Sequence, residues 1–135
     1  MKTRAQIVNL PNFTDERGSL VFGELDAQLP FAPVRYFAIT DAPANAVRGM
    51  HAHRSCQQLV VVLRGSCRMV LVDGFGRDEV TLDSPTLGLH IPAMVWGEQS
   101  DFAPGTVVLV LASDKYDPND YVRSFTRFME MVEAK

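Results

Sequence analysis

Short apolar stretches recur along most of the chain, and Gly, Pro, Asp and Asn separate them. These stretches are rich in Val, Ile, Leu, Phe and Tyr, which favour strands over helices. They predict seven strands, at residues 19–25, 34–40, 57–63, 66–72, 79–82, 86–91 and 106–112. Arg64-Gly65 and Asp73-Gly74 stand between neighbouring stretches and predict hairpin turns. Many short, closely spaced strands indicate an all-β sandwich or barrel of the jelly-roll type.

The end of the chain has a different period. Apolar side chains there recur at helical spacing, after a capping Asp and a Pro suited to a first turn: Tyr121, Phe125, Phe128, Met129 and Val132, preceded by Asp117 and Pro118. The pattern predicts one C-terminal helix, whose apolar face we expect to pack on the core or on a second subunit. Because no repeat, linker or low-complexity tract interrupts the sequence, residues 1–135 are expected to form a single domain.

Charge and composition exclude several classes of partner. Thirteen Lys and Arg stand against sixteen Asp and Glu, a net charge of -3, so the basic field that binds nucleic acid is missing. No apolar run reaches the length of a signal peptide or a membrane span, which predicts a cytoplasmic protein without a membrane partner. Cys56 and Cys67 are expected to be reduced thiols, with a disulfide between them as the less favoured alternative.

Reactive side chains concentrate in the stretch Arg48-Gly49-Met50-His51-Ala52-His53. His51 and His53 are two positions apart, so on a strand both imidazoles point to the same side. They can therefore share one cavity. The plainer alternative is a pair of exposed loop histidines.

A His-x-His pair on a β scaffold also suggests a metal, since neutral imidazole is a common ligand of transition metals. The remaining ligands of a metal cupin are missing, because Gln57 and Gln58 stand where a Glu is usual and residues 92–97 contain no His. His90 is a substitute, which keeps a site of His51, His53 and His90 as an alternative.

Without a metal, the histidine pair suits acid–base catalysis, because the pKa of imidazole lies near neutral pH. Arg48 adds a permanent positive charge whose planar fork of donors fits a phosphate or a developing enolate oxygen. No nucleophile elbow or phosphate-binding loop accompanies these residues.

Several short motifs together resemble one family, the dTDP-4-keto-6-deoxyglucose 3,4-ketoisomerases, over roughly residues 15–128. The motifs are Arg17-Gly18-Ser19-Leu20, the Arg48 to His53 stretch, Gly65-Ser66-Cys67, Leu82-Asp83-Ser84-Pro85, Gly88-Leu89, and the segments 112–117 and 120–123. The Arg-Gly-x-His part is also similar to the related dTDP-sugar 3,5-epimerases. Each motif alone is weak, and their order and spacing make the resemblance specific.

The resemblance implies a homodimeric, metal-independent cupin-type jelly roll that acts on a dTDP-linked 4-keto-6-deoxyhexose. The keto group would move from C4 to C3 through an enediol, for a 3-amino-3,6-dideoxy sugar. The hydrogen on C3 is acidic because it is α to the C4 carbonyl, so imidazoles and a cation suffice without a cofactor. By the same resemblance His51 is the base, His53 a partner or proton relay, and Arg48 a clamp on the substrate.

The resemblance also implies four substrate-binding positions: Arg17, Arg35, His90 and Trp96. Trp96 has the equally favoured alternative of a core or interface aromatic residue. The chain departs from the family at His90, where a Tyr is usual, at Gly97, where a His or Arg is usual, and at Ala38. These departures keep open a rival interpretation, a catalytically silent sugar-nucleotide binding module, beside the metal cupin.

Overall fold

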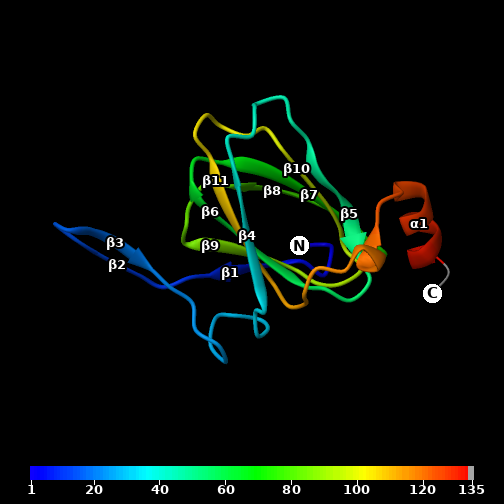
Figure 1. The fold of residues 1–135 in the computed structure, drawn as a ribbon, viewed down its shortest axis with the longest axis horizontal. Helices are drawn as coiled ribbons and strands as arrows, with labels where there is room; N and C mark the ends of the chain where they lie inside the picture. Colours follow the sequence, from blue (N-terminus) through cyan, green and yellow to red (C-terminus); the bar gives the residue numbers. More distant parts are fainter. Residues whose placement is uncertain (134–135) are drawn as a thin grey trace.

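The computed structural model describes residues 1–133 and builds them almost entirely from short antiparallel strands (Figure 1). The strands are β1 (Gln6–Asn9), β2 (Asn12–Asp15), β3 (Gly18–Val21), β4 (Arg35–Thr40), β5 (Arg48–His53), β6 (Gln58–Arg64), β7 (Cys67–Asp73), β8 (Gly76–Leu82), β9 (Leu87–Ile91), β10 (Trp96–Ser100), β11 (Val107–Ala112) and β12 (Tyr121–Val122). A 3-10 turn at Pro118–Asp120 and the helix α1 (Phe125–Glu133) complete the described chain.

Two five-stranded sheets form a jelly-roll-like sandwich. The first sheet has the order β1-β9-β6-β11-β4 and the second β12-β5-β10-β7-β8. Alternate side chains of the strands point between the sheets, so Val60 and Val62 of β6 meet Val108 and Val110 of β11 in one buried core with Leu71 of β7. The predicted all-β jelly roll with one C-terminal helix is confirmed.

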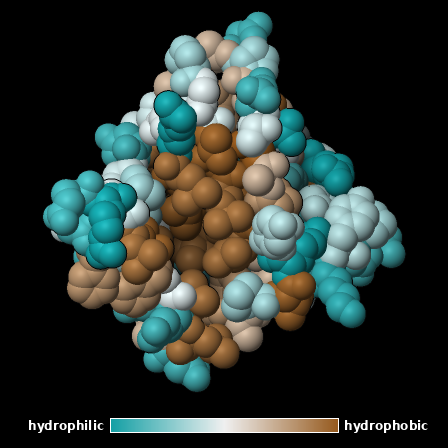
Figure 2. Space-filling model, turned by 60° about the vertical axis from the view of Figure 1, so that its left-hand side comes forward, coloured by the Kyte–Doolittle hydropathy of each residue, from teal (hydrophilic) through white to brown (hydrophobic). Residues whose placement is uncertain are grey.

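The outer face of the first sheet is also apolar. Leu59 and Val61 alternate with the core residues of β6 and point outward, under Leu10 and Leu29 of the N-terminal segment. This cover is incomplete and leaves an apolar groove, lined by Leu10, Val21, Phe22, Gly23, Leu29, Leu59, Val61, Leu63, Pro85, Leu109 and Leu111. Figure 2 shows apolar side chains gathered in a hollow on this side of the molecule.

All seven predicted strands exist, with bounds shifted by a few residues. The stretch 19–25 is the least accurate, because only Gly18–Val21 forms a strand there, and it pairs with β2 in a hairpin that projects from the sandwich (Figure 1). The sequence did not predict β1, β2, β10 and β12, and it placed no strand bounds around β5. β1, β2 and β10 carry many polar residues and β12 has only two residues, so their apolar pattern is weak.

The predicted C-terminal helix begins later than expected. Asp117 accepts a hydrogen bond from the Asn119 amide at 2.9 Å, but the turn that it caps is the 3-10 turn rather than α1. Tyr121 then lies in β12, because its backbone pairs with His53 at the edge of β5. Ser124 caps α1 by accepting from the Arg127 amide at 3.1 Å.

The two cysteines are free and buried, as the reduced-thiol expectation requires. The turn after β6 depends on Gly65, whose φ is 82° and where a Cβ would collide with Thr106. Within residues 1–133, no helix is long and apolar enough to cross a membrane.

Helix α1 is held to the second sheet by Phe128, which is fully buried and packs 5.8 Å from the Trp96 ring. We expect Phe128→Ala to lower the free energy of unfolding by about 3–5 kcal/mol, because the cavity left under the helix has few ways to collapse. Urea unfolding measures this loss. The matched change Phe75→Ala, at a residue with 74% exposure, should cost less than about 0.5 kcal/mol. Equal losses for both variants would contradict this account of the helix.

Candidate active site

A β-bulge in β5 decides which of its side chains share one side of the strand. Opposite β10, Gly97 pairs with His51 and Glu98 pairs with Gly49, so Met50 is the extra residue. Gly49 and Met50 both have positive φ, 81° and 48°. On a regular strand Arg48 and His51, three positions apart, would point to opposite faces. The bulge turns Arg48 to the side of His51 and His53.

Gly49 is required at this bulge for two reasons. Its positive φ is unfavourable for residues with a Cβ, and a Cβ built there would lie 3.1 Å from the Gly97 carbonyl oxygen of the neighbouring strand. The glycine in the Arg-Gly-x-His motif therefore permits the close approach of β5 and β10 that orients the histidine.

Arg48, His51 and His53 line a cavity between the two sheets. Its other lining residues are mostly apolar, with two amides: Phe37, Ile39, Gly49, Gln58, Met69, Ile91, Val95, Gly97, Gln99 and Val110. The polar groups thus converge on a cavity with apolar walls, where hydrogen bonds and charges act more strongly than in water.

The surroundings of His51 determine which ring nitrogen carries its proton. Nδ1 lies 2.6 Å from the Gly49 carbonyl oxygen, which can only accept, so Nδ1 donates and Nε2 is unprotonated. The pKa of His51 is lowered to about 4, first by burial and then by the nearby His53, against the opposing hydrogen bond to Gly49. His51 is therefore a neutral base near pH 7.

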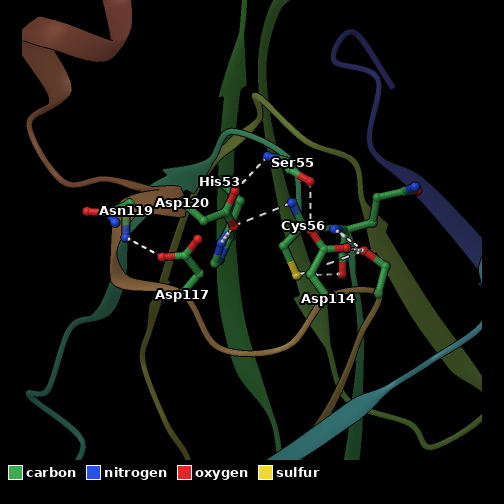
Figure 3. A network of polar contacts seen from close by, with 9 residues as sticks. His53, Ser55, Cys56, Asp114, Asp117, Asn119 and Asp120 are labelled. Atoms are coloured by element: carbon green, nitrogen blue, oxygen red, sulfur yellow. Dashed lines mark hydrogen bonds and ion pairs between the residues drawn. The ribbon is translucent and has the colours of Figure 1, made fainter.

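His53 has the same tautomer for a different reason. Its Nδ1 lies 2.8 Å from Oδ2 of Asp120, a carboxylate that accepts the Nδ1 proton (Figure 3). The side chain of His53 is 6% exposed, and its Nε2 is buried without a hydrogen-bond partner among the described residues. Burial lowers the pKa of His53, and Asp120 partly offsets this effect.

An aromatic residue and a cation cover the two histidines. The Tyr121 ring lies 5.0 Å from the ring of His51 and 4.5 Å from that of His53. The guanidinium of Arg123 stacks 4.3 Å from the Tyr121 ring centroid. Tyr121, which the sequence placed on the C-terminal helix, and Arg123 therefore lie beside the candidate site.

The three predicted catalytic residues lie together on the cavity, whereas the four predicted substrate-binding residues lie at different places in the fold. Arg35 lies close enough for its charge to lower the pKa of His53, and its Nε is buried without a partner among the described residues. Arg17 lies outside the cavity of its own chain, 85% exposed in the projecting hairpin and paired with Asp15 at 2.7 Å.

His90 and Trp96 do not line the cavity. On β9, Leu89 and Ile91 point into the core, so His90 points to the outer face, where its Nε2 lies 2.8 Å from Oε1 of Gln57. Trp96 is buried beneath α1, and its Nε1 donates to Glu98 at 3.1 Å. The core alternative for Trp96 is the one observed.

Of the three departures from the family pattern, one reaches the cavity. Ala38 is exposed on the outer face of β4, because Phe37 and Ile39 point inward. His90 also faces outward. Gly97 lines the cavity opposite His51, and a Cβ there would meet no atom closer than 3.9 Å. The expected substrate-binding position of His90 therefore does not reach the cavity of its own chain.

The geometry contradicts a metal site of His51, His53 and His90, because His90 lies on the other side of its sheet from the cavity. Ligand atoms of His53, Cys56 and Asp120 do lie within 4.8 Å of one another. The hydrogen bond to Asp120 already uses Nδ1 of His53, so metal binding there would break that bond.

Asp120 and Gln99 are site residues that sequence reasoning missed, and Gln58 was considered there only in place of a metal-binding Glu. Asp120 appeared as part of a C-terminal motif, but nothing in the sequence paired it with a histidine 67 positions earlier. Gln58 and Gln99 sit on strands β6 and β10, where the inward direction follows from the sheet register. An alternation count on β6, with Val60 and Val62 inward, would have found Gln58.

Comparisons with known proteins give one consistent result. The model of the family FdtA, described as WxcM-like, C-terminal, matches residues 3–133. The TDP-4-oxo-6-deoxy-alpha-D-glucose-3,4-oxoisomerase of Aneurinibacillus thermoaerophilus is 42% identical over 127 residues, 94% of this chain and 91% of that protein.

Solved structures agree. A 3,4-ketoisomerase from Helicobacter canadensis has a TM-score of 0.92 and 37% identity, over 96% of this chain and 98% of its own. A histidine-to-asparagine mutant of the 3,4-ketoisomerase QdtA from Thermoanaerobacterium thermosaccharolyticum, in complex with TDP-4-keto-6-deoxyglucose, has a TM-score of 0.95 and 30% identity, over 100% and 98% of the two chains.

The low pKa of His51 is directly measurable. We expect its ring resonances to titrate with a midpoint near 4, below the ordinary 6.5, in proton–nitrogen NMR spectra assigned with the His51→Asn variant. Because the unfolded chain takes up this proton first, stability should fall as the pH drops from about 6.5 towards 4. The fall should be smaller in His51→Asn. A midpoint near 6.5 would contradict the buried, neutral base.

Proposed function

Because this chain belongs to the FdtA family of WxcM-like proteins, we propose that it is a sugar-nucleotide 3,4-ketoisomerase that converts TDP-4-keto-6-deoxyglucose to its 3-keto isomer. One observation carries the chemistry. Two imidazoles, each with Nδ1 protonated by its hydrogen bond and Nε2 free, converge with Arg48 on one cavity. The product ketone suits an aminotransferase that makes a 3-amino-3,6-dideoxy sugar.

His51 is the base of the first step. Its Nε2 takes the proton from C3, the electron pair of the broken C3–H bond forms a C3–C4 double bond, and the carbonyl electrons move to O4. In the second step the enediol carbon C4 receives the proton from His51, and C3 becomes the ketone. The low pKa of His51 supports this role, because the base is unprotonated at neutral pH.

His53 carries the second proton. The shift of the keto group requires that O3 lose a proton and O4 gain one, and the free Nε2 of His53 can accept the first and return it to the other. The rings of His51 and His53 are 4.8 Å apart, which suits two groups that act on neighbouring carbon and oxygen atoms of one sugar. Asp120 stabilises the imidazolium form that exists between the two transfers.

Arg48 and Arg35 are the proposed anion-binding groups. The guanidinium of Arg48 enters the same cavity as the histidines and suits the diphosphate or the developing charge on O4. No electron leaves the sugar, because the pair lost at C3 is gained at C4, and the mechanism therefore needs no redox cofactor.

We also propose that the protein is a homodimer. The hairpin of β2 and β3 projects from the sandwich and exposes Phe13 and Leu20 at 68% and 61% (Figure 1). The apolar groove on the first sheet is a matching surface for a second copy. A hairpin docked on the partner copy would also place Arg17 beside that copy instead of its own sandwich. This placement would explain how Arg17 can bind substrate although it lies outside the cavity of its own chain.

The whole chain is proposed to act as one isomerase domain in the cytoplasm. The family model spans nearly all of it, and both cysteines are free thiols, which suits a reducing compartment.

The function is tested by proton NMR of the protein with TDP-4-keto-6-deoxyglucose in heavy water. We expect a 3-keto product, with deuterium at C4 wherever the proton held by His51 exchanges with the solvent before it is returned. His51→Asn should lower turnover by about 10²-fold or more, while TDP still binds, because the base that removes the C3 proton is lost. Tight TDP binding without conversion by the wild type would favour the silent binding module. Near-normal turnover of the variant would remove His51 from the base role.

The dimer is tested by light scattering. The wild type should have twice the 15.0 kDa mass of one chain. The double variant Phe13→Asp, Leu20→Asp should be monomeric with an unchanged circular dichroism spectrum, because two charges would have to enter an apolar groove. Phe75→Asp, at another exposed aromatic residue, should keep the dimer mass. A monomeric wild type would overturn the proposal.

A further inference from the structure

We propose that Asp120 is a positioning residue that holds His53 in the one tautomer able to exchange protons with the sugar. The catalytic part of this inference rests on the proposed function, whereas the tautomer is a property of the protein alone. Asp120 does not line the cavity, so it would act through His53.

Asp120 is itself held rigidly. Its Oδ1 accepts from the Ser55 amide at 2.7 Å, and its Oδ2 accepts from the Cys56 amide at 3.4 Å as well as from His53 (Figure 3). Its backbone carbonyl accepts from the Arg54 amide at 2.8 Å. The turn after β5 and the turn before β12 are therefore fastened to each other through this one residue.

The donors around Asp120 require a carboxylate. Both backbone amides can only donate, and their hydrogen bonds lower the pKa of Asp120 together with His53, against the effect of burial, which raises it. An ionised carboxylate can only accept. The one remaining arrangement for His53 is a protonated Nδ1, which leaves a lone pair on Nε2 of a ring that lines the cavity.

An amide in place of this carboxylate reverses the tautomer. In Asp120→Asn, the short hydrogen bond from Ser55 keeps the amide oxygen at the position of Oδ1. The NH₂ group then faces Nδ1 of His53, which must become an acceptor, and the proton moves to Nε2. A protonated Nε2 on a neutral ring cannot accept the proton of O3.

The charges that face His53 explain why this support is needed. Burial disfavours its imidazolium form, and so do Arg35 of β4 and Arg123 after β12. Its neighbour His51 on β5 contributes no favourable charge while it is neutral. The hydrogen bond and the negative charge of Asp120 favour the imidazolium form of His53 and so oppose these effects. Loss of Asp120 should therefore also hinder the transient protonation of His53.

The first measurement uses the unmodified protein. Nitrogen NMR of the imidazoles at pH 7, with His53 assigned from the His53→Asn spectrum, should show the proton on Nδ1. In Asp120→Asn the proton should move to Nε2. Because this readout needs no substrate, it separates the inference from the proposed function.

The second measurement is kinetic. Asp120→Asn should lower kcat by about 10²- to 10⁴-fold with little change in KM, since proton transfer is impaired and substrate contacts remain. The control is Asp114→Asn. Asp114 accepts from the hydroxyl groups of Ser55 at 2.6 Å and Ser113 at 2.9 Å in the same network, without a hydrogen bond to His53. It should keep the tautomer and kcat.

Each outcome decides the matter. A wild-type His53 with its proton on Nε2, or an Asp120→Asn variant with unchanged tautomer and kcat, overturns the inference. Equal losses in both aspartate variants, with the tautomer kept, would reduce Asp120 to a purely structural role and also overturn it. If both proteins show the expected tautomers but the wild type does not turn over the substrate, the proposed function is overturned. The positioning of His53 by Asp120 would still be established.

Discussion

The site depends on the extra residue in β5. A strand without the bulge would direct Arg48 away from His51, and the cation would then lie on the opposite side of the sheet from the base. The bulge is possible because Gly49 accepts a positive φ and a close approach to Gly97. The same distortion places the Gly49 carbonyl within 2.6 Å of His51 Nδ1, so one local irregularity orients the base and sets its tautomer.

The two histidines obtain the same protonation state from different parts of the fold. His51 is set by the backbone of its own strand, whereas His53 is set by Asp120, which enters from the far end of the chain. A neutral carbonyl leaves His51 as a base of low pKa, and a carboxylate supports a positive charge on His53. In the proposed mechanism, this difference assigns two chemically identical side chains the separate roles of carbon base and oxygen proton carrier.

The two faces of the first sheet have different surroundings. The inward residues of the first sheet build the core and the cavity wall, and its outward residues form the apolar groove. Alternation along β4 and β9 assigns Ala38 and His90 to the outer face, so those departures from the family pattern bear on that surface. Gly97 is the departure that changes the cavity itself.

The sequence alone determined the jelly-roll class, the C-terminal helix and the group Arg48, His51 and His53, because strand alternation and a compact motif are local properties. It also identified the family, through motifs spread over the chain. Only the tertiary structure decided that Asp120 and Tyr121 adjoin the histidines, that Trp96 anchors α1, and that His90 faces away. These facts depend on sheet register and on contacts between distant segments. Register is set by packing of the whole sandwich, and a pattern read along one strand carries no information about which distant residue will lie beside it.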